Sequence, residues 1–259
     1  MDNRRVSKRL AIVTAGGSAP AILINLLKQQ FPDALLIVES SESKSTFLKR
    51  RARKIGWFQT LAQLPMQLIS KLGKTWAQKR YQQIADDYNT SQTMPSDLQT
   101  IHIGSVNDGS LAGHLRDNQI ATTLVIGTRI FSKATIASID IPLLNFHGGL
   151  TPDYRGLNPG YWSLIEGKPD RFGGTVHFID AGIDTGNVIA QKSCKPHPND
   201  NFLTYHHTIS AQCADICIAA VKSALEGNVE PMMAQGISKQ HYHPTVYGYF
   251  WNGITKNIW

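Results

Sequence analysis

Three polar side chains suited to proton transfer stand close together in the second half of the sequence. Asn145 and His147 end the apolar run 143–147, and Asp184 follows in the glycine-rich segment 180–186. On a strand, Asn145 and His147 point to the same face because they are two residues apart. An amide, an imidazole and a carboxylate suit general acid–base chemistry at a polarised carbonyl. Gly148 and Gly149 follow directly, where the backbone can approach a ligand closely.

Two motifs surround these residues. Residues 145–156 read N-F-H-x-x-L-x-P-x-Y-R-G, and residues 180–189 read D-x-G-x-D-T-G-x-V-I. Together they resemble the formyltransferases that use 10-formyltetrahydrofolate, a group that includes the glycinamide-ribotide, methionyl-tRNA and amino-sugar formyltransferases. The resemblance covers roughly residues 9–40 and 97–190.

The resemblance implies a role for each matching position. Asn145 and a protonated His147 would stabilise a tetrahedral oxyanion, while Asp184 would orient His147 and help a water carry the proton of the attacking amine. The strand end at 128–132 resembles the pterin-binding segment of the family. The donor would therefore be 10-formyltetrahydrofolate, bound by Arg129, Ile130, Phe131, Asp180 and Gly182. The acceptor would be bound by Gly16, Gly17, Ser18 and Arg155.

Elements that could position these residues alternate along the chain. A strand at 10–14, a helix at 21–30 preceded by Ser18 as a cap, and a strand at 34–39 form a β-loop-α-β unit. Further strands are predicted at 98–103, 122–127, 143–147, 174–179 and 188–191. Further helices are predicted at 109–118, 133–139, 161–166 and 202–225. The predicted fold is α/β: a Rossmann-like, mostly parallel sheet with helices on both faces.

The segment 44–93 departs from the family pattern. It reads as two or three helices divided at Gly56, Pro65 and Gly73, and residues 44–80 hold ten Lys or Arg and no Asp or Glu. The whole chain has a formal net charge of +7, so its basicity belongs to this segment. Three interpretations remain open: packing on the core or a dimer mate, an amphipathic surface for anionic lipid, or a site for RNA or another polyanion.

The predicted organisation is one catalytic domain at 1–230, with the helical insertion 44–93 inside it, followed by an aromatic tail at 231–259. We interpret the tail as a lid or a subunit contact. His241 and His243 alternate there, but no further ligands stand at metal-site spacing, so no metal is expected. His177 lies inside a strand pattern, where packing is the expected role. Cys213 and Cys217 are one helical turn apart and fit core packing.

The expected activity is transfer of the formyl group to a primary amine, most plausibly on a nucleotide-linked amino sugar used for surface polysaccharide. Glycinamide ribotide or methionyl-tRNA as acceptor, or hydrolysis of the formyl donor, are the alternatives. A methionyl-tRNA enzyme would be expected to carry a further C-terminal domain. We also expect a homodimer in the cytoplasm, peripheral to the inner face of the membrane if 44–80 meets anionic lipid, and no nucleic-acid partner.

Overall fold

The computed structural model describes residues 9–41, 48, 52–53, 56–57 and 64–259. Its centre is a seven-stranded sheet in the order β3-β2-β1-β4-β5-β7-β8. The strands are β1 (Arg9–Thr14), β2 (Leu35–Glu39), β3 (Thr100–Ile103), β4 (Ile120–Ile126), β5 (Leu143–His147), β7 (Gly173–Phe178) and β8 (Val188–Ser193). All pairs from β3 to β5 are parallel, and β7 runs antiparallel to both of its neighbours. The predicted mostly parallel, Rossmann-like sheet is confirmed.

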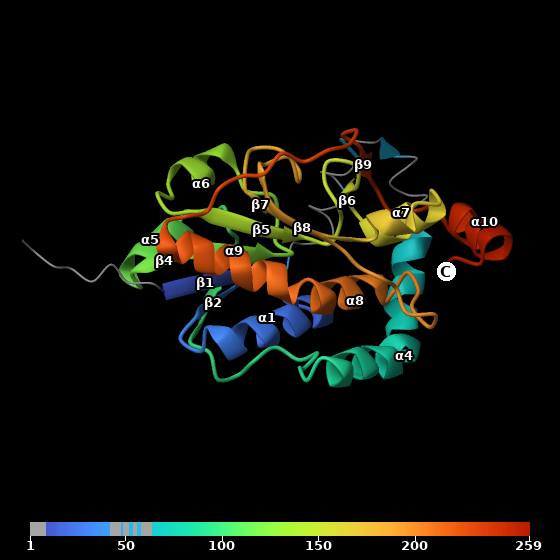
Figure 1. The fold of residues 1–259 in the computed structure, drawn as a ribbon, viewed down its shortest axis with the longest axis horizontal. Coiled ribbons are helices and arrows are strands. Elements are labelled where there is room, and N and C mark those ends of the chain that lie inside the picture. Colours follow the sequence, from blue (N-terminus) through green and yellow to red (C-terminus); the bar gives the residue numbers. More distant parts are fainter. Residues whose placement is uncertain (1–8, 42–47, 49–51, 54–55, 58–63) are drawn as a thin grey trace, which may run out of the picture.

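Helices cover both faces of the sheet (Figure 1). Side chains alternate along a strand, and β1 shows the consequence: Leu10 and Ile12 join one core cluster, while Ala11 and Val13 join the other. The first cluster lies under α1 (Ser18–Gln30), α8 (Tyr205–Gln212) and α9 (Ala214–Glu226). The second lies under α5 (Leu111–Asp117) and α6 (Lys133–Ala137). Two packed faces leave the carboxyl-end edge of the sheet as the natural place for a ligand.

The last long helix differs from its predicted form. The sequence predicts one helix over 202–225, but α8 ends at Gln212, and α9 begins at Ala214 after a bend of 49°. Cys213 has a backbone ψ of 6° at the junction, which breaks the regular helix. Gly227 ends α9 in the left-handed region at φ 77°, as a glycine after a helix commonly does.

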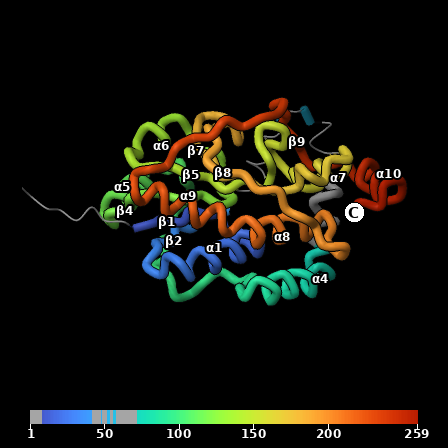
Figure 2. The backbone as a smooth tube through the Cα atoms, viewed as in Figure 1, coloured from blue at the N-terminus to red at the C-terminus, as the bar shows by residue number. Residues whose placement is uncertain are grey.

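The described part of the insertion is a single long helix, α4 (Leu64–Asp87), which begins with Pro65 in its first turn and continues through Gly73. Figure 2 follows its backbone along the edge of the molecule beside α1. Tyr81 of α4 is buried, and its hydroxyl donates to the carbonyl of Leu203 at 3.2 Å. The predicted helices before residue 64 lie outside the described residues, apart from a few positions.

The C-terminal tail joins the fold instead of lying loosely over it. β9 (Gln240–His241) pairs in parallel with β6 (Arg155–Gly156), and α10 (Val246–Lys256) follows. Between β6 and β7 the chain forms α7 (Pro159–Ile165) and the 3-10 turn η1 (Pro169–Arg171). In the part of the chain that the structure describes, no single helix is long and apolar enough to cross a membrane; only α8 and α9 taken as a bent pair meet that measure.

Candidate active site

β5 positions two of the three predicted catalytic side chains. Leu144 and Phe146 point into the core under α8 and α9, so the alternating residues Asn145 and His147 face the other way. Because β4 lies parallel on one side and β7 antiparallel on the other, β5 is held along both edges. Both side chains are therefore presented from one of the most rigidly paired strands of the sheet.

The third side chain, Asp184, lies in the connection between β7 and β8. Its backbone is in the left-handed region at φ 51°, a conformation that Asp and Asn tolerate better than most residues. The carboxylate Oδ2 accepts a hydrogen bond from the backbone N–H of Gly156 at 2.9 Å. Gly186 closes the loop: a Cβ there would lie 1.7 Å from the carbonyl oxygen of Phe178, so no other residue fits. The D-T-G motif thus has a steric reason as well as a chemical one.

His147 and Asp184 meet in the structure. His147 Nδ1 lies 3.5 Å from Asp184 Oδ2, while His147 Nε2 lies 2.7 Å from the backbone carbonyl of Tyr154. A carbonyl can only accept, so Nε2 carries a proton and donates it to Tyr154. Nδ1, the ring nitrogen beside Asp184, is therefore the one left to take part in a reaction.

Asp184 is held as a carboxylate. Burial alone would raise its pKa, but nearby His147 and His177 and the Gly156 N–H together hold the pKa of this carboxyl well below its usual range. An ionised Asp184 stabilises positive charge on His147 Nδ1. This pair can therefore present a protonated imidazole to a reacting oxygen, while the carboxylate is available to accept a proton.

His177 belongs to the same cluster, although the sequence pattern predicts only a packing role. It is the direct cross-strand partner of Asn145. Its Nδ1 donates to the carbonyl of Phe178 at 2.7 Å, so Nε2 is left to accept from the amide nitrogen of Asn145 at 3.0 Å. Nε2 also lies 3.7 Å from Asp184 Oδ1. β7 lies beside β5 in the sheet, and this pairing cannot be read from the sequence pattern. The contact between His177 and Asn145 is therefore seen only in the structure.

A cavity of about 950 Å³ surrounds the cluster. Asn145, His147, His177 and Asp184 all line it. One arm, which we call the donor arm, is lined mainly by apolar side chains and backbone from the ends of β4 and β7. The opposite arm, which we call the acceptor arm, is lined by the start of α1, by α4, by α8 and by the segment 240–243. The lining of this one cavity therefore comes from two groups of segments that differ in composition.

The residues predicted to bind the donor line the donor arm: Arg129, Ile130, Phe131, Asp180 and Gly182. The Arg129 guanidinium donates to the carbonyls of Gly104 and Ser40, so it also ties the ends of neighbouring strands together. Asp180 accepts from the Thr185 hydroxyl at 2.7 Å and from the Gly182 N–H at 3.0 Å. Arg129 and Asp180 thus hold neighbouring segments of the chain in place, in addition to lining the cavity.

The residues predicted to bind the acceptor divide into two groups. Ser18 lines the acceptor arm, where its hydroxyl lies 2.8 Å from His207 Nε2. Gly17, not Ser18, is the N-cap of α1. Gly16 and Gly17 turn the chain there and do not line the cavity. Arg155 does not line it either, because its Nη1 donates to the carbonyl of Ile183 at 2.9 Å and braces the loop that carries Asp184.

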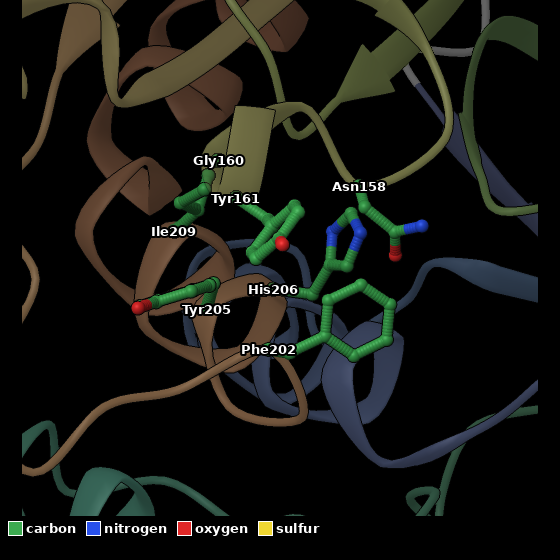
Figure 3. Close-up of a pocket in the computed structure, with 7 residues that line it drawn as sticks. All are labelled: Asn158, Gly160, Tyr161, Phe202, Tyr205, His206 and Ile209. Carbon is green, nitrogen blue, oxygen red and sulfur yellow. The ribbon is translucent and has the colours of Figure 1, made fainter. Parts of the chain in front are cut away.

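Two adjacent histidines of α8 face the acceptor arm. Burial, together with the neighbouring His147, lowers the pKa of His206 to about 4. Burial, with His206 and Lys74 nearby, lowers the pKa of His207 to about 3. Figure 3 shows the His206 ring lying among Tyr161, Phe202 and Asn158. Both imidazoles are neutral at pH 7, so they offer hydrogen bonds to a substrate without adding charge.

Other cavity residues come from segments that the motifs do not cover. Lys74 and Tyr81 of α4 line the acceptor arm, and Tyr81 stacks on His207 with ring centroids 3.8 Å apart. Residues 240–243 of the tail line it as well. The periodicity of α4 indicated a helix, but nothing in the sequence showed which end of the sheet it would reach. Among the described residues, no group of three His, Cys, Asp or Glu side chains could hold a metal ion.

Comparison with known proteins agrees with this geometry. Residues 101–221, which include Asn145, His147 and Asp184, match the family model described as formyl transferase. Residues 101–221 belong to the formyl transferase family. The resemblance carried by the two motifs is thereby confirmed, and it continues beyond them into α8 and α9. This matched segment carries the cluster of Asn145, His147, His177 and Asp184.

The curated relatives found by sequence are named methionyl-tRNA formyltransferases. The methionyl-tRNA formyltransferase of Syntrophus aciditrophicus (strain SB) is 34% identical over 116 residues, which are 45% of this chain and 36% of that protein. The chain thus spans about a third of the length of that relative.

Solved structures share the fold over most of the chain. The phosphoribosylglycinamide formyltransferase of Anaplasma phagocytophilum has a TM-score of 0.57 at 14% identity, covering 91% of this chain and 100% of that one. A sugar N-formyltransferase from Shewanella sp FDAARGOS_354 has a TM-score of 0.53 at 16% identity, covering 90% and 76%. A sugar 3N-formyl transferase solved with dTDP and 5-N-formyl-THF has a TM-score of 0.51 at 14% identity, covering 90% and 69%.

Proposed function

We propose that this protein transfers the formyl group of 10-formyltetrahydrofolate to a primary amine. The observation that carries the proposal is the meeting of Asn145, His147 and Asp184 in one cavity, within a formyl transferase domain. In this proposal residues 1–230 form the catalytic domain, with 44–93 inserted in it and 231–259 as its tail.

The donor arm suits a folate. Its walls are the apolar side chains Val125, Ile126, Ile130, Phe131, Ile179 and Ile183. A flat heterocycle fits between such side chains and can bond to the backbone of residues 127–131 at the end of β4. The role of Arg129, Ile130, Phe131, Asp180 and Gly182 in holding the donor remains our prediction, supported by their place in this arm.

The chemistry follows from the hydrogen bonds of the cluster. The Asn145 amide gives one N–H to His177, so its second N–H is left for the oxygen of the formyl group. His147 Nδ1 presents the other donor. When the amine attacks, these two donors stabilise the oxyanion, an effect often worth about 3 kcal/mol per donor. Asp184 then assists, through water, in moving the proton from the amine nitrogen to the nitrogen of tetrahydrofolate, which leaves as its bond to the formyl carbon breaks. No nucleophilic Ser or Cys is required, because the acceptor supplies the nucleophile.

For the acceptor we propose a nucleotide-linked amino sugar. The acceptor arm offers Lys74 and the N-terminal turn of α1 at Ser18, and no carboxylate of the described residues lines it apart from Asp184 at its inner end. Such surroundings favour an anionic substrate. Two of the structures with this fold are of sugar formyltransferases, and their names supply the substrate class only as support for the proposal.

The test is a panel of acceptors with 10-formyltetrahydrofolate: nucleotide-linked 3-amino and 4-amino deoxysugars, glycinamide ribotide and methionyl-tRNA. We expect formylated sugar at a kcat/KM well above that of the other two acceptors. Higher kcat/KM with glycinamide ribotide or methionyl-tRNA would overturn the acceptor and leave the cluster intact. Formate released equally fast without any amine would instead show a hydrolase, since water can replace the nitrogen. A homodimer and a cytoplasmic place for the protein also remain predictions.

A further inference from the structure

α10 carries aromatic and aliphatic side chains on two opposite faces. Tyr249 packs inward against Tyr161 and Phe202. The other face holds Tyr247, Phe250, Trp251 and Ile254, whose spacing of three and four residues places them in one stripe. Their exposed fractions are 75%, 46%, 57% and 75%. A stripe of four large apolar side chains open to water is unusual for a helix that already buries its other face.

α4 adds a second group of exposed apolar side chains. Trp76 is 89% exposed and Leu72 is 66% exposed. α4 and the residues just after α10 contact the same segment of the chain, at the consecutive residues Phe202 and Leu203. Gly73 of α4 is so close to Leu203 that a Cβ on it would lie 2.6 Å from that side chain. The N–H of Phe202 donates to the carbonyl of Trp259, just after α10, at 2.6 Å. In Figure 1 α10 is drawn beside the upper end of α4.

Both segments are free of carboxylates. Residues 44–80 hold ten Lys or Arg and no Asp or Glu, and residues 231–259 hold Lys239 and Lys256 and no Asp or Glu. The same segments contain Trp57, Trp76, Trp251 and Trp259, four of the five tryptophans in the chain. The exposed residues Leu72, Trp76, Tyr247, Phe250, Trp251 and Ile254, with their basic neighbours, form what we call the aromatic–basic surface.

We propose that the aromatic–basic surface docks on an anionic lipid bilayer. Tryptophan and tyrosine favour the boundary between headgroups and acyl chains, and lysines beside them are attracted to anionic headgroups. A second copy of this chain fits the charge less well. A two-fold dimer would place the same patch against itself and bring like-charged segments together, since neither 44–80 nor 231–259 contains an Asp or Glu.

The docked orientation has a consequence for the cavity. Lys74 lies two residues before Trp76 and lines the acceptor arm, and Tyr242 and His243 line it just before α10 begins. Residues two apart on a helix point to nearly opposite sides, so docking through Trp76 takes place on the side of α4 that does not line the acceptor arm. This docking does not depend on the identity of the acceptor, so its test stands apart from that of the proposed activity.

The experiment is co-sedimentation of the full chain with two vesicles: phosphatidylcholine alone, and phosphatidylcholine with about a third phosphatidylglycerol. We expect binding to the anionic vesicles only. It should weaken steeply when salt rises from about 0.1 M to about 1 M, because the Debye length falls from about 10 Å to about 3 Å. Equal binding to both vesicles, or none to either, would overturn the proposal.

Point variants test which residues of the aromatic–basic surface bind the vesicles. The double variant Trp76→Ser/Trp251→Ser should lower binding to anionic vesicles by about tenfold or more, since it removes two exposed membrane-inserting rings. The matched control is Met233→Ser/Ile237→Ser, which removes two side chains that are 91% and 85% exposed elsewhere in the tail. Lys79→Gln should weaken binding more than Lys133→Gln.

Equal binding by the tryptophan double variant and the wild type, at unchanged Tm, would contradict the proposal. So would a wild-type dimer in sedimentation velocity that the tryptophan double variant converts to a monomer, without vesicle binding by either form.

Discussion

The catalytic cluster and the wall of the acceptor arm are held in different ways. Asn145, His147 and His177 come from neighbouring paired strands, and Asp184 from the tight loop that follows β7. The acceptor arm is lined instead by the start of α1, by α4, by α8 and by residues 240–243, which are distant in sequence and lie outside the two family motifs. The proposed catalytic groups thus lie on paired strands and the loop after them, while the acceptor arm is built from segments outside the two motifs. Substitutions in the two regions should therefore change different kinetic constants.

The largest effect is expected from His147→Asn and Asp184→Asn. Each removes one half of the pair that holds the proton, so kcat should fall by about a thousandfold or more while the KM for the folate changes little. Because the two residues act as a unit, the double variant should be scarcely worse than the worse single one. Steady-state turnover with a saturating acceptor measures this. Near-normal kcat in either single variant would contradict the assigned roles.

Asn145→Ala should have the next largest effect. It deletes one oxyanion donor, whose loss typically costs about a hundredfold to a thousandfold in kcat. Asn145→Gln is the control, since its amide is retained but displaced by one methylene. A folded Asn145→Ala variant that lost only folate affinity, with kcat preserved, would place this amide in donor binding instead.

His177 is expected to act as a positioning residue for Asn145. Removal of its ring acceptor in His177→Leu should lower kcat by about tenfold to a hundredfold through misplacement of the Asn145 amide. His177→Gln offers an acceptor oxygen near the same place and should recover part of that loss. Measurement of Tm alongside kcat separates positioning from folding: equal kcat in both variants would leave His177 with a packing role only.

Lys74→Gln tests the acceptor wall. If this lysine favours an anionic acceptor, the KM for the acceptor should rise by about tenfold, while kcat and the KM for the folate stay near their original values. Lys79→Gln lies on the same helix but does not line the cavity, and it should change neither constant. A fall in kcat with unchanged acceptor KM would show that Lys74 acts with the catalytic cluster. It would contradict the assignment of Lys74 to acceptor binding.

The smallest effect concerns stability against acid. His207 takes a proton near pH 6.5 when unfolded but only near pH 3 when folded, because its burial and the neighbouring His206 and Lys74 lower the pKa more than Asp200 and a backbone hydrogen bond at Leu203 raise it. Between these values the unfolded state binds more protons, so stability falls as pH falls. His207→Gln should remove about 1 kcal/mol of the loss seen between pH 6.5 and about pH 5. Urea unfolding of both proteins at the two pH values measures it, and identical slopes would disprove the assignment.

Much of the sheet could be predicted from the sequence, because its buried strands are short apolar runs that alternate with helical periods. The contact between His147 and Asp184 followed from two motifs whose resemblance had already placed them in one site. His177 was missed because its role depends on which strand lies beside β5, and periodicity does not reveal strand order. The break at Cys213 was missed because the apolar pattern continues across it.

The residues that line the acceptor arm could not be predicted from the sequence, for a different reason. Lys74 and Tyr81 line the cavity only because α4 packs against α8, which lies more than a hundred residues further along the chain. The hydrogen bond from Tyr81 to Leu203, just before α8, is one such contact. Arg155 shows the opposite error. A guanidinium beside a catalytic strand suggested an anion site, but the carbonyl of Ile183 takes its Nη1 hydrogen bond.

The long reach of the Tyr81–Leu203 hydrogen bond also bears on the order in which the molecule assembles. The strands and loop that carry the cluster lie within residues 143–184, whereas α4 must find α8 across 122 residues. Contacts between distant parts of a chain require costly loop closure and tend to form late and open first. During folding the paired strands β5 and β7 and the loop of Asp184 should therefore form while the compartment for the acceptor is still open. Amide protons of α4 should exchange with solvent sooner than those of β5, so the protein would lose its acceptor site before it loses its chemistry.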